Sequence, residues 1–107
     1  MIVKIYSIHD QCAGVFGRPF MLPSEGIAVR AFTDQVNTKD GGDLNRHPEH
    51  FSLYELGQFD DSNGSFETHV EPKFIIAGNS VYQQTFAAQD GMENHLKSII
   101  EKIEELL

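Results

Sequence analysis

The sequence has one cysteine and no long apolar run. Cys12 is alone, so no intrachain disulfide can form. We find neither a basic leader followed by an apolar stretch nor a run of about 18 or more apolar residues, the length that crosses a membrane. These absences lead us to expect a cytoplasmic protein that does not associate with a membrane.

Basic residues are also scarce. Eight Lys and Arg stand against sixteen Asp and Glu, which gives a net charge of −8. Nucleic-acid binding draws much of its affinity from basic side chains that meet phosphates, so the overall charge argues against it. The imbalance is uneven, because residues 1–50 hold five basic and six acidic side chains whereas residues 51–107 hold three and ten. Only the first half has the charge balance that a local basic face requires.

The rest of the composition is that of a folded globular protein. Hydrophobic residues make up 40% and charged residues 22% of the 107 positions, both close to the averages for soluble domains. A chain of this length suits one domain with one modest core. We therefore expect a core domain over residues 1–80.

The first third of the chain predicts a strand, an extended segment and a helix. Residues 2–8 are rich in β-branched and aromatic side chains, as in a central strand. Glycine and proline confine the next ordered piece to residues 20–22. Ser24 is a suitable N-cap for a helix over residues 25–36, whose apolar positions recur at three- and four-residue spacings.

The middle of the chain predicts a long loop and a hairpin. Residues 37–50 contain a Gly-Gly pair and Pro48 and indicate a loop. A strand over residues 51–59 leads to Asn63-Gly64, a strong hairpin signal, and then to an alternating, half-buried strand over 65–70. Pro72 is expected to end that strand, and residues 73–78 to form a further one.

The end of the chain predicts a connector over residues 81–91 and an amphipathic helix over 92–107. Apolar residues there alternate four- and three-residue steps, the rhythm of a coiled coil. Two heptads are too short to be stable alone, so the helix either packs on its own domain or mediates oligomerisation. The residues of the predicted seam are Met92, Leu96, Ile99, Ile103 and Leu106. The expected fold is α+β, with a mainly antiparallel sheet of about four strands, one packed helix and a C-terminal helix.

Two groups of polar residues invite a catalytic or metal-site interpretation. His47 and His50 lie three apart, but Pro48 stands between them, and a zinc site normally needs three or four convergent ligands. We interpret the pair as part of a solvated loop or a helix cap, and expect no metal and no other cofactor.

Carboxylates surround the predicted hairpin and raise the question of acid–base catalysis: Glu55, Asp60, Asp61 and Glu67. Such catalysis needs two carboxyl groups held in distinct environments, whereas acidic hairpin tips are usually solvated turns. The chain also has no phosphate-binding glycine loop, no G-x-S-x-G and no H-E-x-x-H motif. We therefore expect a protein that is not an enzyme.

Aromatic residues lie in or beside several predicted strands. On an open sheet such rings can stack on the bases of single-stranded nucleic acid while cations follow its backbone. The alternative is that the rings form the core, because aromatic residues dominate core burial. Their number alone favours the core.

Three stretches of the chain resemble a known family: KIYSIHD, GRPFMLPSEGIAVRAFTDQVN and HPEHFSLYELGQFDDSNG. In order and spacing they are similar to the small nonstructural protein of gokushoviruses, tailless icosahedral phages of the microvirus family with circular single-stranded DNA genomes. The resemblance covers residues 4–64, and AVRAFTDQVN followed by HPEHFSLYELGQFD is its most specific part. It implies a protein of the infected bacterial cytoplasm, absent from the virion shell, that binds single-stranded DNA or switches replication toward single-strand synthesis and packaging.

The sequence and the resemblance together predict a phage accessory protein of genome replication that binds single-stranded DNA. Oligomerisation would join several weak basic faces into a stronger one. The alternative is an assembly or adaptor protein that contacts a viral or host replication or assembly protein through its acidic half and C-terminal helix. The predicted site consists of five cations for phosphates and three rings for bases: Lys4, Arg18, Arg30, Lys39, Arg46, Tyr6, Phe20 and Tyr54.

Overall fold

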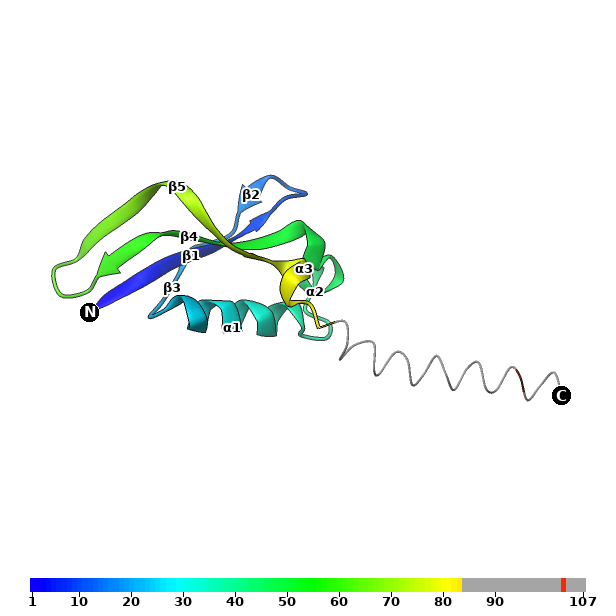
Figure 1. Ribbon diagram of the computed structural model, residues 1–107. Coiled ribbons are helices and arrows are strands. Elements are labelled where there is room, and N and C mark those ends of the chain that lie inside the picture. Colours follow the sequence, from blue (N-terminus) through cyan, green and yellow to red (C-terminus); the bar gives the residue numbers. More distant parts are fainter. Residues whose placement is uncertain (84–102, 104–107) are drawn as a thin grey trace.

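A computed structural model of the chain describes residues 1–83 and residue 103. It has an α+β fold in which an antiparallel sheet is covered on one side by a helix (Figure 1). This confirms the predicted fold class. The predicted oligomerisation seam over 92–107 lies outside the described residues, except for Ile103, which is helical and exposed.

The sheet is organised around β1 (Ile2–Asp10). On one side β1 pairs along its whole length with β4 (Phe51–Asp60), which pairs in turn with β5 (Ser65–Ala77). On the other side it pairs with two short segments, β2 (Val15–Phe16) near its end and β3 (Phe20–Leu22) near its middle. The strand order is therefore β2-β1-β4-β5, with β3 beside β1.

Helix α1 (Glu25–Val36) has the predicted bounds and cap. The Ser24 hydroxyl accepts a hydrogen bond from the Ile27 amide at 3.4 Å, which satisfies one of the free N–H groups at the helix start. One face of α1 packs on β1 and β4, and this interface is the core of the described domain. The buried core residues are Tyr6, Ala28, Phe32, Val36 and Leu53.

The segment predicted as a loop over residues 37–50 contains two short helices. These are α2 (Asp43–Arg46) and the 3-10 helix η1 (Pro48–His50). Proline is well suited to the first position of η1, because its ring fixes φ near the helical value and its missing N–H has no helical partner there. A third short helix, α3 (Gly78–Val81), lies against η1, where a Cβ on Gly78 would clash with the Pro48 carbonyl oxygen.

Strand β5 corrects the prediction that Pro72 ends a strand. It runs continuously through Pro72, but its ladder with β4 jumps from Gly57–Thr68 to Glu55–Lys73. Residues 69–72 bow out of the ladder, and Figure 1 shows β5 bending away from β4. A proline is tolerated there because no ladder hydrogen bond requires its N–H.

The predicted half-burial of residues 65–70 is also wrong. All six are exposed, and the Val70 side chain is as accessible as in an extended chain. Sequence alternation predicted the strand type correctly, but it could not show that this half of β5 has no layer packed against it.

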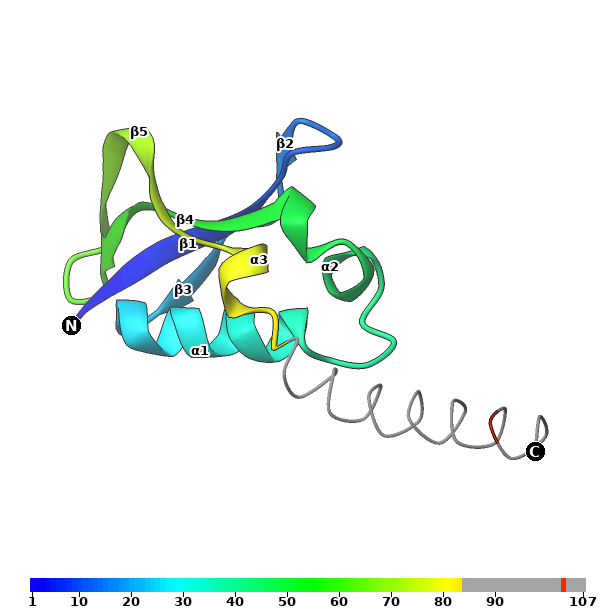
Figure 2. The same ribbon diagram turned by 45° about the vertical axis from the view of Figure 1, so that its right-hand side comes forward.

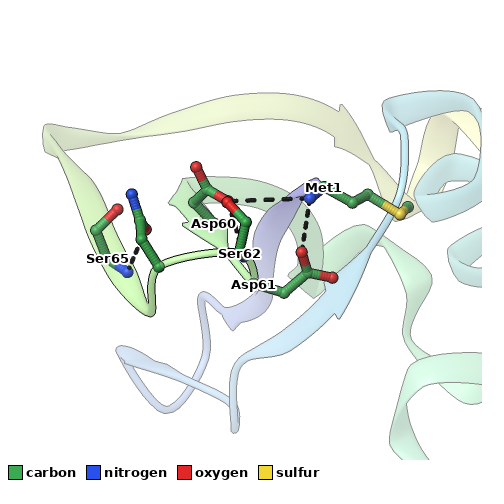
Figure 3. Close-up of polar contacts among 6 residues, drawn as sticks. Met1, Asp60, Asp61, Ser62 and Ser65 are labelled. Atoms are coloured by element: carbon green, nitrogen blue, oxygen red, sulfur yellow. Dashed lines mark hydrogen bonds and ion pairs between the residues drawn. The ribbon is translucent and has the colours of Figure 1, made fainter.

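The acidic turn between β4 and β5 is held by local polar contacts (Figure 3). The Asp60 carboxylate accepts hydrogen bonds from the side chain and backbone amide of Ser62, which lower the pKa of Asp60. The Met1 amino group lies 2.6 Å from a carboxylate oxygen of Asp61, and this hydrogen bond raises the pKa of the amino group. Gly64 has a positive φ of 74°, as expected of the predicted Asn-Gly turn.

Candidate nucleic-acid interface

A row of aromatic rings lies on the side of the sheet away from α1. Ile8 of β1 and Leu53 of β4 pack toward α1, and successive side chains of a strand alternate between faces. The next residues, His9 and Tyr54, therefore point to the other side. In the ladders Phe16 of β2 is paired with His9, and Phe74 of β5 is paired with Tyr54. These four residues form what we call the ring row: His9, Phe16, Tyr54 and Phe74.

The rings of the ring row touch one another across four strands. The ring centroids of His9 and Phe16 are 4.6 Å apart, those of Phe16 and Tyr54 5.3 Å, and those of Tyr54 and Phe74 5.7 Å. The last two pairs meet edge to face, at 80°, a favourable aromatic arrangement. These contacts fix the rings in place without enclosing them.

The ring row is partly open to solvent. Phe16 is 42% and Phe74 54% exposed, and His9 and Tyr54 are half-buried. Figure 2 shows α1 and α3 on the same side of β1 and β4, while the turn between β1 and β2 rises on the opposite side. The row thus occupies the sheet face that these helices leave uncovered.

The nearest acidic residues along the strands are turned away from the ring row. Asp10 follows His9 and Glu55 follows Tyr54, so strand alternation directs both toward the other face. Each has a partner of its own. The Asp10 carboxylate accepts from the Cys12 amide at 3.0 Å, and the Glu55 carboxylate lies 2.6 Å from the His69 ring. Neither of these two carboxylates therefore faces the ring row.

Two of the three predicted stacking rings lie on the α1 side of the sheet. Tyr6 has no exposed surface and belongs to the core, so its assignment to a DNA-binding surface is wrong. Phe20 is half-buried against that core, with its ring centroid 6.1 Å from that of Tyr6. Tyr54 is the one predicted ring that belongs to the ring row.

The five predicted cations are spread over different elements. Lys4 donates to the Gln58 side chain at 3.2 Å, on the face that Tyr6 shares. Arg30 is exposed on α1, and Arg46 of α2 forms an ion pair with Asp43 at 3.1 Å. Lys39 is exposed after α1, and Arg18 is exposed two residues beyond Phe16. Of these five, Arg18 is the one next to the ring row along the chain.

Sequence reasoning missed three of the four rings in the row: His9, Phe16 and Phe74. The period-two pattern of residues 2–10 could have placed His9 on the face opposite Ile8. Phe16 lies in a two-residue strand without a periodic signal. Phe74 joins Tyr54 only because the β4–β5 ladder skips residues 69–72, which no local pattern predicts.

Comparisons with known proteins agree with the resemblance at a coarser level. A family model described as Phage ORF5 protein matches residues 3–81, about three quarters of the chain. No curated protein matches, and no solved structure does. Within the described residues, no helix has the length and apolar character needed to cross a membrane.

Proposed function

The chain belongs to the Phage ORF5 protein family, and from this premise we propose that it is a non-enzymatic accessory protein of phage genome replication that binds single-stranded DNA. The family match shows a phage protein. The resemblance to gokushovirus nonstructural proteins supports the finer proposal, which places the protein in the cytoplasm of the infected bacterium. The single structural observation that carries the proposal is the ring row.

Partly exposed rings on a sheet are suited to the bases of a single strand. Every base has a π face, so stacking tolerates any sequence, and each stacked base contributes about 1–3 kcal/mol. A duplex keeps its bases paired and stacked on one another, which leaves their faces inaccessible. The ring row, with Phe16 and Phe74 about half exposed, would therefore select single strands over duplexes.

Phosphate contacts make a smaller contribution in this proposal. The chain carries a net charge of −8, and the predicted cations do not gather on one face. Arg18, exposed and two residues beyond Phe16, is the cation we assign to the DNA backbone. Oligomerisation, which would place several ring rows along one strand, stays a prediction together with its seam over residues 92–107.

The test is a titration of the purified chain with fluorescent single-stranded and double-stranded oligonucleotides at low and moderate salt. Light scattering in the same buffers gives the mass of the binding species. We expect preference for the single strand. Phe74→Ala should weaken single-strand binding about fivefold or more, because the variant has one ring fewer on which a base can stack.

Phe66→Ala is the matched control. Phe66 lies on the same strand and is 60% exposed, close to the 54% of Phe74, but it packs on Phe59 near the β4–β5 turn. We expect this variant to bind like the wild type. No binding at low salt, or an equal loss of affinity in both variants, would remove the ring row as a DNA site.

A further inference from the structure

The histidine pair in the HPEH segment is brought together by η1. Residues i and i+3 eclipse one another along a 3-10 helix, and His47 and His50 have that spacing: His47 is the N-cap of η1 and His50 is its last residue. Their rings stack with centroids 5.5 Å apart. Pro48 begins this helical turn, so it does not keep the two histidines apart.

Glu49 adds a third potential ligand to this pair. Its carboxylate oxygen lies 3.5 Å from Nδ1 of His47 and 4.0 Å from Nε2 of His50. The three ligand atoms all lie within 4.8 Å of one another. A zinc ion bound at about 2.0–2.2 Å by tetrahedral ligands holds those ligands roughly 3.5 Å apart. Small side-chain rotations would therefore bring the three atoms onto one ion.

The backbone that carries these ligands is tied to its surroundings. The His50 carbonyl accepts a hydrogen bond from the Gln11 amide at 2.8 Å, and the His50 amide donates to the His47 carbonyl at 3.0 Å. Pro48 is buried against α3. Ligands on an anchored turn lose less conformational entropy on binding an ion than ligands on a free loop.

The two histidines also line a cavity of about 310 Å³ beside the β1–β2 turn. Asp10 and Asp43 contribute to the same lining, and their carboxylates favour the approach of a cation. The cavity leaves room for water or another small ligand at the open position of a three-ligand site.

We propose that His47, Glu49 and His50 bind a divalent transition-metal ion of the Zn²⁺ class. Two imidazoles and one carboxylate are a donor set that such ions prefer, whereas Mg²⁺ and Ca²⁺ prefer oxygen ligands alone. The site is distinct from the ring row and does not depend on DNA binding.

The test is a titration of the full chain, freed of metal with a chelator, with Zn²⁺ in competition with a fluorescent zinc indicator. We expect one Zn²⁺ per chain, a higher melting temperature with Zn²⁺ because the ion binds the folded state, and no competition from millimolar Mg²⁺ or Ca²⁺. Substituting both histidines (His47→Ala with His50→Ala) should weaken binding at least 100-fold. Glu49→Gln, a change at an exposed side chain, should weaken it about tenfold.

Two controls exclude other zinc ligands. His69→Gln removes a histidine outside the cluster, and Cys12→Ser removes the thiol that lines the same cavity; both should bind Zn²⁺ like the wild type. Circular dichroism checks that each variant is folded. Absence of stoichiometric binding, full binding by a folded double-histidine variant or by Glu49→Gln, or loss of binding in Cys12→Ser alone would overturn the proposal.

Discussion

The Tyr6 hydroxyl is a buried polar group without a hydrogen-bond partner among the described residues. Leaving such a group unpaired costs about 1–3 kcal/mol, because water is removed and nothing replaces it. Burial, followed by the nearby charges of Glu55 and Glu25, raises the pKa of Tyr6 to about 12. The ring of Tyr6 therefore stabilises the core, while its hydroxyl opposes burial.

Tyr6→Phe should leave the free energy of unfolding unchanged or raise it by up to about 1–3 kcal/mol, since the variant keeps the ring and removes the unpaired hydroxyl. The difference should grow at high pH. In the unfolded wild type Tyr6 ionises near its ordinary pKa of 10.0, and in the folded protein near 12. The unfolded state thus binds fewer protons in this window, and wild-type stability falls as pH rises through it.

Urea denaturation of both proteins at pH 7 and at several values between 10 and 12 measures this effect. The free energy of unfolding of Tyr6→Phe should fall less than that of the wild type as the pH rises, because the variant has no Tyr6 hydroxyl to ionise. A variant less stable than the wild type by more than about 1 kcal/mol at pH 7 would show that the hydroxyl has a stabilising partner.

At the scale of elements, the β5 arch (residues 69–72) is fastened to β4 by one polar contact. His69 lies in the arch, and its ring nitrogen is 2.6 Å from the carboxylate of Glu55, which is only 6% exposed. A buried carboxylate needs a hydrogen-bond partner to offset its desolvation. His69 supplies that partner from the segment that the ladder skips.

His69→Ala should lower the free energy of unfolding by about 1–3 kcal/mol, because it leaves a buried acceptor unpaired. Urea denaturation at pH 7 is the measurement. Val70→Ala is the control, since Val70 is the next residue and is fully exposed; its effect should stay within about 0.5 kcal/mol. Equal effects of the two substitutions would mean that the contact with Glu55 does not hold the arch.

Elements defined by local signals were predicted from the sequence, and elements defined by distant partners were not. The Ser24 cap and the helical spacing of apolar residues predicted α1 with its bounds, and Asn63-Gly64 predicted the hairpin. Continuation of β5 through Pro72 depends on a register jump against β4. Pro48 at the first position of η1 is a local signal, but the close packing of η1 against Gly78 of α3 is not. Neither the register jump nor this packing is visible within a local window of sequence.

At the scale of the whole molecule, the domain has a helix-covered face and a face with exposed rings. The sequence predicted which aromatic residues lie in strands, but it did not predict on which face of the sheet each ring lies. That assignment depends on where α1 packs, which puts Tyr6 and Phe20 on one side and Tyr54 on the other. Arg30 lies on α1, on the helix-covered side, whereas Arg18 follows Phe16 of the ring row by two residues.

This division makes the salt dependence of DNA binding a test of which face is used. For a single strand, removing one cation that meets a phosphate reduces the slope of log affinity against log salt by about 0.7. Arg18→Ala should flatten the slope by about that amount. Arg30→Ala is a matched change of charge at another exposed arginine, on the helix that covers the opposite face, and should leave the slope unchanged. Equal flattening by both variants would show that the strand also contacts α1 and would contradict a site confined to the ring-row face.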